Sequence, residues 1–286
     1  DESALAWVQR VVNELDALPN VRRLADSTVA GYYDHNMLTV IERSPEQDWL
    51  RERLWRVRAQ RVLIATGAVE RPLVFPDNDR PGIMLAYSVS AYLHRYGVQV
   101  GDQVVVATNN NSAYRTAFDL ARACRNVRAI IDTRPAIARE LQKQSDAYGI
   151  EVLTGSGVVG VSGRNAVKRV DVAPLNRQSD KRPINCDIVC CSGGWNPVVH
   201  LHSHSGATPV YDSDLACFVP GESVQPSWCV GAAQGIFDLK GCLTDGFDKG
   251  SRAVESLGLS ARTLDLPDLP TTLPLDVQPI WELART

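Results

Sequence analysis

The sequence lacks the features that mark several classes of protein. It has 286 residues and a formal net charge of −3 at pH 7, with no block of Lys and Arg that could neutralise a row of phosphates. No apolar run approaches the roughly 18 residues that a membrane span needs, and the first residues lack a basic region followed by an apolar one. We therefore expect no nucleic acid partner, no membrane span and a cytoplasmic location.

The sequence also lacks a CxxC pair. An odd number of scattered cysteines is not typical of a secreted disulfide framework, so we expect reduced thiols. The adjacent Cys190 and Cys191 lie in an apolar run, and we expect them to fill the core rather than carry redox chemistry. Without an active CxxC, a stand-alone NAD(P)H:disulfide reductase is disfavoured. The cysteines are Cys124, Cys186, Cys190, Cys191, Cys217, Cys229 and Cys242.

Length and composition predict a folded protein of roughly two domains. Hydrophobic residues make up 44% of the chain and charged residues 22%, which suits a packed core with a polar surface. The chain has no initiator Met and begins on a predicted helix. We therefore expect an internal piece of a longer protein. The apolar residues of that helix are spaced by three and four and are Leu5, Val8, Val12, Leu15 and Leu18.

The first part of the chain after that helix has the pattern of β structure. Strands are predicted at 28–33 and 37–42, joined by a turn at 34–36, and a strand buried on both faces is predicted at 61–67. Three prolines then fall in residues 71–82, which show no periodicity. We expect this stretch to be a crossover between domains.

From residue 83 the pattern changes to alternating strands and helices. Strands are predicted at 103–107 and 127–132 on either side of a helix at 112–123, and a further helix is predicted at 134–148. A strand, a helix and a strand within about 30 residues form a βαβ unit, which requires parallel strands. The sequence thus predicts an α/β fold with a doubly wound sheet.

The loop of this βαβ unit is the best candidate for a nucleotide site. In a dinucleotide fingerprint, Gly-rich residues follow the first strand, and an acidic residue about 20 positions on holds a ribose hydroxyl. Here Thr108, Asn110 and Ala113 take the fingerprint positions, and Asp132 ends the second strand. A carboxylate there favours NAD over NADP, whereas an ordinary capped turn remains the alternative. The other candidate residues are Asn109, Asn111, Ser112 and Thr133.

Two further small-residue motifs could approach a nucleotide. Ala65, Thr66 and Gly67 follow the predicted buried strand, and small residues let a backbone come close to a ligand. Gly231 and Ala232 lie where a strand would meet a helix N-terminus. A simple tight turn is the alternative for the first motif, and the second lacks an acidic residue that could hold a ribose.

Other titratable residues give weaker signals. His200, His202 and His204 alternate, which on a strand would place three imidazoles on one face, but no Cys or carboxylate follows at a metal-binding spacing. We expect no metal site. Asp34 with His35, and His94, are expected to be turn and core residues, and we name no catalytic residue.

Several motifs taken together resemble the α subunits of heterotetrameric sarcosine oxidases. They occur in the order that such subunits show, and the likeness covers nearly the whole chain. They are Gly31–Asn36, Leu54–Ala59, Ala65–Pro72, Asn78–Gly82, Ser112–Ala117, Ser192–Leu201, which includes Gly194, and Gly231–Gly250.

The resemblance implies a fold of the flavin disulfide reductase type, with FAD/NAD(P)-binding domains. An NAD-binding domain (83–196) would be inserted in a partial flavin-type domain (1–82 and 197–263), followed by a Pro-rich exit linker (264–286). The glycine-rich flavin fingerprint would precede this piece and a folate-binding domain would follow it. We accordingly expect NAD to bind here better than a flavin.

The resemblance also implies an activity for the whole assembly. Such enzymes oxidise sarcosine to glycine, with formaldehyde or methylene-tetrahydrofolate and hydrogen peroxide as products. The amine substrate and an FAD belong to the β subunit, an FMN lies near the α/β contact, and γ and δ subunits complete the heterotetramer. The fragment alone is expected to be inactive. Alternatives are an opine oxidase or hydrogen cyanide synthase subunit, or a scaffold whose nucleotide is structural.

Overall fold

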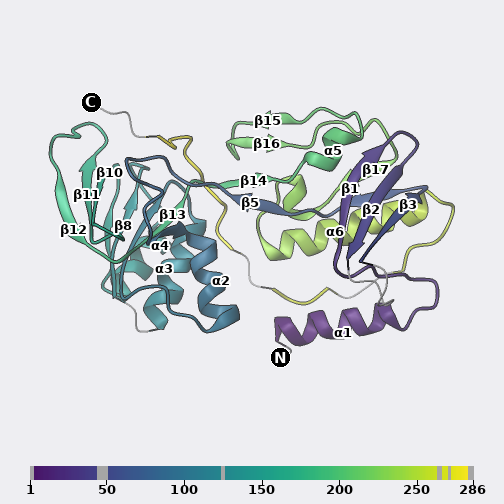
Figure 1. Cartoon of the computed structure of the whole chain (residues 1–286), viewed down its shortest axis with the longest axis horizontal. Helices are drawn as coiled ribbons and strands as arrows, with labels where there is room; N and C mark the ends of the chain where they lie inside the picture. Colours follow the sequence, from purple (N-terminus) through teal and green to yellow (C-terminus); the bar gives the residue numbers. More distant parts are fainter. Residues whose placement is uncertain (1–2, 44–50, 124–125, 263–265, 270–271, 283–286) are drawn as a thin grey trace. The chain divides into compact units, whose positions relative to one another are not determined.

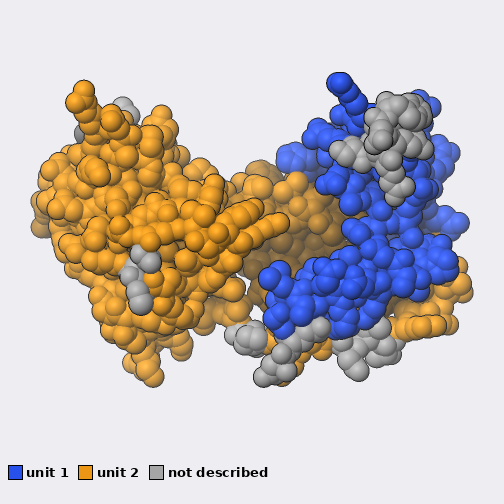
Figure 2. Space-filling view, turned by 60° about the horizontal axis from the view of Figure 1, so that its bottom comes forward, with its two compact units in different colours: residues 1–62, 200–208, 222–228 blue, residues 63–199, 209–221, 229–286 orange. Residues whose placement is uncertain are grey.

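The computed structural model describes residues 3–43, 51–123, 126–262, 266–269 and 272–282. Its contacts divide the chain into two compact units, which Figure 2 colours separately. Unit 1 comprises residues 1–62, 200–208 and 222–228, and unit 2 comprises residues 63–199, 209–221 and 229–286. The alternating strand and helix region and the C-terminal segment therefore belong to the same unit.

Unit 1 contains the predicted N-terminal helix and hairpin. The Ser3 hydroxyl caps the helix by accepting the Ala6 N–H at 3.2 Å. The strands pair antiparallel in the order β1-β2-β3, and the tight turn between β1 and β2 places His35 and Asn36 at positive φ. The Tyr32 hydroxyl donates to Asn36 Oδ1 at 2.6 Å, which fixes that turn. The elements are α1 (Ala4–Asp16), β1 (Ser27–Tyr33), β2 (Met37–Arg43) and β3 (Glu52–Arg58).

The alternating histidines lie on a helix, so the three imidazoles do not share one face as they would on a strand. Residues His200–His204 form the short helix α5, so His200 and His204 lie on one side and His202 on the other. His202 is fully buried, and both of its ring nitrogens lack a hydrogen-bond partner among the described residues. Burial lowers the pKa of His202, which favours the neutral ring. Within the described residues no cluster of metal-ligating side chains forms.

Unit 2 is built on a parallel sheet of five strands, in the order β6-β13-β7-β8-β9. The predicted strands at 103–107 and 127–132 are confirmed as its neighbouring central strands, and all adjacent pairs run parallel. A long crossover brings β13 between β6 and β7. The strands are β6 (Ile83–Leu85), β7 (Gln103–Thr108), β8 (Asn126–Asp132), β9 (Glu151–Leu153) and β13 (Ile188–Ser192).

Helices cover one face of this sheet and a second sheet covers the other (Figure 1). Val104 and Val106 of β7 pack with residues of the helices, whereas Val105 and Ala107 pack with the antiparallel sheet β10-β11-β12. Because both faces are buried, the central strands are almost continuously apolar. The covering elements are α2 (Ala86–Tyr96), α3 (Ser112–Arg122), α4 (Arg139–Ala147), β10 (Ser156–Ser162), β11 (Arg169–Pro174) and β12 (Arg182–Asn185).

The predicted helix at 134–148 begins later than expected. Helix α4 starts at Arg139, because the chain after β8 first makes a turn that is held from two sides. The Asp132 carboxylate accepts the Arg134 N–H at 2.9 Å, and the Arg134 carbonyl accepts the Gly155 N–H at 2.7 Å. The backbone at residue 134 is thus held in a turn by one local and one tertiary hydrogen bond, and the helix begins five residues later.

The remaining elements are short, apart from α6. The strand predicted at 61–67 forms over three residues only, and the expectation that it is buried on both faces is wrong, because Leu63 is 40% exposed while Val62 and Ile64 are buried. This strand pairs with β17. Among the described residues no helix is both long and apolar enough to cross a membrane. The elements are β4 (Val62–Ile64), β5 (Ala68–Glu70), β14 (Trp195–Pro197), β15 (Val210–Asp212), β16 (Cys217–Val219), β17 (Ser227–Cys229), the 3-10 helix η1 (Gly231–Gln234) and α6 (Leu239–Glu255).

The cysteines of β13 lie in the core, as the sequence predicts. Cys190 and Cys191 have 0% and 2% of their surfaces exposed. Burial raises the pKa of both thiols, that of Cys191 to about 12, so neither is a reactive thiolate at neutral pH. Cys124 lies outside the described residues.

Candidate functional site

The candidate nucleotide loop lies at the carboxyl edge of the parallel sheet. Ser192 of β13 is paired in register with Thr108 of β7, and Thr108 with Asp132 of β8, so three strands end side by side. Helix α3 begins at Ser112, and Ala113 is buried at its start. A crevice outside the carboxyl ends of parallel strands is where α/β folds bind ligands. The topology therefore places the predicted residues at the edge where such folds have their ligand crevice, and we refer to this edge as the cleft.

The polar side chains of this loop are satisfied within the protein. Asn109 and Asn110 are fully buried. The Asn110 amide donates to the Ser192 carbonyl and hydroxyl at 3.3 and 3.2 Å. Its Oδ1 accepts the Ser112 N–H and hydroxyl at 2.9 and 2.6 Å. Asn110 thus holds the loop in shape, and it presents no side-chain donor toward the cleft.

Asp132 occupies the position at which a ribose hydroxyl would be bound, but it is enclosed. Its carboxylate accepts the Tyr114 hydroxyl at 2.8 Å and pairs with the Arg134 guanidinium at 2.7 Å. Asp132 has 0% and Arg134 4% of its side chain exposed. Burial and the Asp132 charge raise the pKa of the Tyr114 phenol, which keeps it a donor. All of the hydrogen bonds of Asp132 in the structure are internal.

A segment near the C-terminal end of the chain lies directly on this loop. We refer to residues 272–282 as the strap. The Asn111 N–H donates to the Leu275 carbonyl at 2.8 Å, and the Gln278 N–H donates to the Asn109 carbonyl at 2.9 Å. The Asn109 side chain donates in turn to the Gln278 carbonyl at 2.8 Å. Residues 264–286 were expected to be an exit linker, and the strap within them pairs closely with the cleft.

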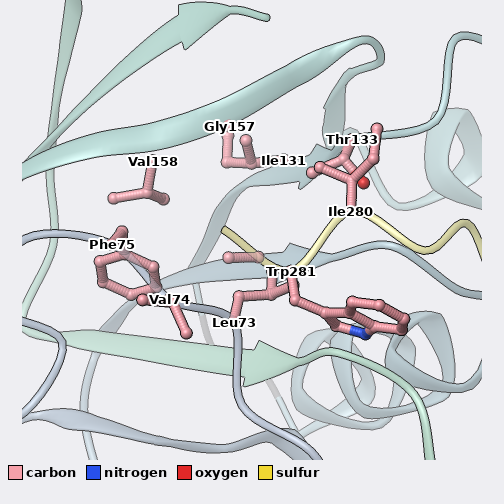
Figure 3. Close-up of a pocket in the computed structure, with 10 residues that line it drawn as sticks. Leu73, Val74, Phe75, Ile131, Thr133, Gly157, Val158, Ile280 and Trp281 are labelled. Atoms are coloured by element: carbon pink, nitrogen blue, oxygen red, sulfur yellow. The ribbon is translucent and has the colours of Figure 1, made fainter. Parts of the chain in front are cut away.

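The end of the strap is anchored on the loop that follows β13. The Trp281 indole donates to the Gly193 carbonyl at 2.8 Å, and the Arg71 guanidinium lies 4.3 Å from the centre of the indole ring. Figure 3 shows Ile280 and Trp281 lining a narrow pocket with Leu73 and Thr133. The Thr133 hydroxyl is buried there without a hydrogen-bond partner among the described residues.

The glycines of the loop after β13 fit the approach of the strap. A Cβ on Gly193 would lie 2.7 Å from the Pro72 carbonyl oxygen and 3.1 Å from Trp281 Cδ1. Gly194 has a φ of +93°, and a Cβ there would lie 3.2 Å from Val277 Cγ2. The predicted site residue Gly194 thus contacts the strap.

The second candidate edge, formed by Ala65, Thr66 and Gly67 after β4, is open. Ala65 and Thr66 are exposed, and Gly67 has a φ of +75° with no atom within 4 Å of an added Cβ. The Thr66 hydroxyl donates to the Val198 carbonyl at 2.7 Å. This edge has the small, left-handed backbone that a close ligand approach needs.

Gly231 and Ala232 begin the short helix η1. Gly231 has a φ of +61°, and its N–H donates to the Asp245 carboxylate of α6 at 2.8 Å. An acidic side chain therefore reaches this motif from a helix that follows in sequence. The sequence of residues 230–235 carries no signal for this contact with Asp245.

Glu70 is a buried carboxyl that the motif analysis did not single out as a site. It ends β5, accepts the Tyr87 N–H at 2.8 Å at the start of α2, and has 8% of its surface exposed. Burial raises the pKa of Glu70 to about 7.

Three further residues that contact the candidate site were not predicted from the sequence: Arg71, Tyr114 and Arg134. Only Arg134 carried a sequence signal, because it follows the acidic strand end by two residues.

Comparison with curated proteins gives a consistent result. The chain is 37% identical over 295 residues to sarcosine oxidase subunit alpha of Corynebacterium sp. (strain P-1), which covers 98% of this chain and 30% of that protein. The subunit alpha of Rhizobium meliloti (strain 1021) is 34% identical over 90% of this chain and 26% of that protein. The chain is homologous to a segment of sarcosine oxidase subunit alpha. The resemblance expected from the sequence motifs is thereby confirmed. No protein-family profile matches the chain.

Solved structures support the predicted fold. L-proline dehydrogenase from P. horikoshii aligns with a TM-score of 0.61 and 18% identity, covering 92% of this chain and 50% of that one. Thioredoxin reductase from T. acidophilum aligns with a TM-score of 0.61 and 16% identity, covering 81% and 74%. These likenesses confirm the FAD/NAD(P)-binding α/β fold of the flavin disulfide reductase type.

Proposed function

We propose that this chain forms the nucleotide-binding part of an oxidoreductase subunit of the sarcosine oxidase type. The observation that carries the proposal is the 37% identity that extends over 98% of the chain. The chain spans about 30% of the length of the curated relatives, so the activity belongs to a larger protein. We assign to that larger protein, assembled with its partner subunits, the oxidation of sarcosine to glycine, with formaldehyde or methylene-tetrahydrofolate and hydrogen peroxide as products.

The domain assignment is part of the proposal. Residues 83–196 form the NAD-type domain, and residues 1–82 and 197–263 form two pieces of a flavin-type domain. The five-stranded parallel sheet, with one face covered by helices, supports dinucleotide binding by residues 83–196. The substrate-oxidising FAD and the FMN are assigned to the assembly with β, γ and δ subunits.

The fit of NAD to the candidate cleft depends on the strap. An NAD pyrophosphate would face the start of α3, where the Asn111 N–H lies. The positive end of the helix dipole would stabilise its negative charge there. In this structure that N–H donates to Leu275, and Asp132 is enclosed by Tyr114 and Arg134. NAD does not fit this conformation, so no step of the oxidation is assigned to the cleft.

The proposed activity is tested with the assembled complex. The full-length subunit is co-expressed with its partner subunits, and hydrogen peroxide release is measured with sarcosine, with an opine and, as a control, with glycine. Peroxide formation that depends on sarcosine supports the proposal. A complex that oxidises an opine or glycine but not sarcosine contradicts it and favours the related amine oxidases.

A scaffold without redox chemistry is the second candidate function. The enclosed Asp132 and the occupied Asn111 N–H favour it for residues 83–196. The protein is mixed with NADH and an added flavin or dye, and reduction of the acceptor is followed by absorbance. Reduction above the protein-free rate argues for a catalyst, whereas an unchanged rate argues for a scaffold.

A further inference from the structure

We propose that the strap, residues 272–282, is the resident occupant of the cleft at the ends of β7 and β8, and that a dinucleotide enters only by displacing it. The proposal rests on the proposed function, because it takes the released cleft to have affinity for a dinucleotide. The strap contacts both the start of α3 and the end of β8, the two places at which this fold holds a pyrophosphate and a ribose.

The backbone of the strap takes up the hydrogen bonds that a pyrophosphate would use. The Leu275 carbonyl oxygen lies 2.8 Å from the Asn111 nitrogen, and the Asn111 side chain donates to the Pro274 carbonyl at 2.8 Å. These acceptors occupy the place of phosphate oxygens at a helix N-terminus. Since the Asn111 N–H is a single donor, the strap and a pyrophosphate compete for it.

The strap also places an anion on the buried cation of the cleft. Only 4% of the Arg134 side chain is exposed to solvent. Its Nη1 donates to the Asp276 carboxylate at 2.9 Å and to the Asp276 carbonyl at 2.7 Å. Asp276 therefore occupies the side of this cation that Asp132 leaves free, where an anionic ligand would otherwise bind.

The strap fits the cleft less completely than a polar ligand would. The Thr133 hydroxyl lies buried beside the apolar Ile280 side chain in Figure 3, and it has no partner among the described residues. Gln278 Oε1 is also buried without a described partner. Leaving a buried polar group unpaired destabilises the closed arrangement, which favours exchange of the strap for a ligand that supplies hydroxyls.

Competition with a tethered segment weakens ligand binding in a predictable way. Only the fraction of molecules whose strap is released can bind, so the apparent dissociation constant rises by the inverse of that fraction. Weakening the strap without changing the loop should therefore tighten NAD binding. Asp276 and Trp281 are the strap side chains with the most directed contacts, whereas Leu273 is 41% exposed and serves as the matched control.

The experiment is a calorimetric titration of the full-length protein with NAD⁺. The unmodified protein, the D276A/W281A variant and the L273A control are compared, with the single D276A variant as a milder form. Thermal unfolding establishes that each is folded. We expect the double variant to bind NAD⁺ at least tenfold more tightly than the unmodified protein and the control. Hydrogen exchange should then show NAD⁺-dependent protection at residues 108–113.

Two results would overturn the proposal, and they differ in meaning. Equal NAD⁺ affinity in the unmodified protein and the variants, with protection at 108–113, removes the strap as a barrier but leaves the nucleotide site of the proposed function intact. Faster exchange of the strap amides in the double variant without any NAD⁺ binding shows that the released cleft has no dinucleotide affinity. The sarcosine-dependent release of peroxide by the complex tests the family activity independently of both.

Discussion

The two candidate nucleotide edges of unit 2 differ in what covers them. At the end of β7, Asn109 and Asn110 have 0% of their surfaces exposed, and the strap engages the loop through backbone hydrogen bonds. At the end of β4, Ala65 and Thr66 are exposed, and a Cβ added to Gly67 would have no atom within 4 Å. The loop after β7 has the topology of a nucleotide site, yet another part of the same chain covers it. The short turn after β4 is the more solvent-accessible of the two edges.

Loss of Asp132 should have the largest effect, because it breaks the buried polar centre of the closed edge. In Asp132→Ala the Tyr114 hydroxyl loses its acceptor. The buried Arg134 guanidinium loses its paired carboxylate on the Nε and Nη2 side while keeping Asp276 on Nη1. We expect the free energy of unfolding to fall by about 3–5 kcal/mol, as for other broken buried ion pairs. Urea unfolding measures this.

The exposed pair of Glu151 with Arg182 provides the control. Their atoms lie 2.6 Å apart, but 45% and 54% of the two side chains are exposed. Glu151→Ala should cost less than about 1 kcal/mol, because solvent screens the pair. Equal losses in the two variants would show that the charges at the end of β8 are not sealed.

The pH dependence of stability should change less, through Glu70. Its pKa is raised from 4.5 to about 7 in the folded protein, so the folded state holds this proton more tightly than the unfolded state. The stabilisation is fully present below pH 4.5 and is lost as the pH rises through about 7. Glu70→Gln, which stays neutral, should lose less stability between pH 5 and pH 8, by on the order of 2 kcal/mol.

Urea unfolding at the two pH values checks this expectation. The exposed Glu255 of α6 gives the matched variant, Glu255→Gln, whose pH profile should follow that of the unmodified protein. If the free energy of unfolding of Glu70→Gln changed with pH in the same way as that of the unmodified protein, Glu70 would be as fully solvated as Glu255, which would contradict the expectation.

The smallest expected effect concerns the open edge. Gly67→Ala places a side chain at a φ of +75° without any clash, so only backbone strain opposes it, and we expect a loss of about 1 kcal/mol. Gly246→Ala, in the interior of α6 and also without contacts, should instead stabilise the protein by about 0.5–1 kcal/mol. Thermal unfolding of both variants compares them. A loss well above that for Gly67→Ala would indicate that another segment packs on this edge.

The sequence predicted the fold well where short-range patterns determine it. Helix α1, the β1-β2 hairpin and the βαβ unit of β7, α3 and β8 follow from hydrophobic period and turn residues, which act within a few positions. The helical form of residues 200–204 was not predicted, because alternating histidines carry no periodic signal strong enough to exclude a strand. The late start of α4 depended on Gly155, which no local pattern connects to Arg134.

The sequence predicted that the candidate residues meet at one edge of the sheet, but not that a distant segment lies on them. Residues 108–113 and Asp132 do meet at one edge of the sheet, because parallel strands end together. The contacts from Leu275 to Asn111 and from Gln278 to Asn109 join residues more than 160 positions apart. A proline-rich stretch without periodicity gives no indication in the sequence that it will dock on a specific loop, so the strap could be recognised only in three dimensions.

Hydrogen exchange of the unliganded protein tests the central claim most directly. If the strap occupies the cleft, the amides of Asn111 and Gln278 should exchange far more slowly than an exposed amide but faster than that of the buried strand residue Val106, because their hydrogen bonds open each time the strap leaves the folded protein. Residue-resolved NMR measures the three rates in one sample. Exchange of Asn111 and Gln278 at the rate of an exposed amide, while Val106 stays protected, would contradict a strap seated in the cleft.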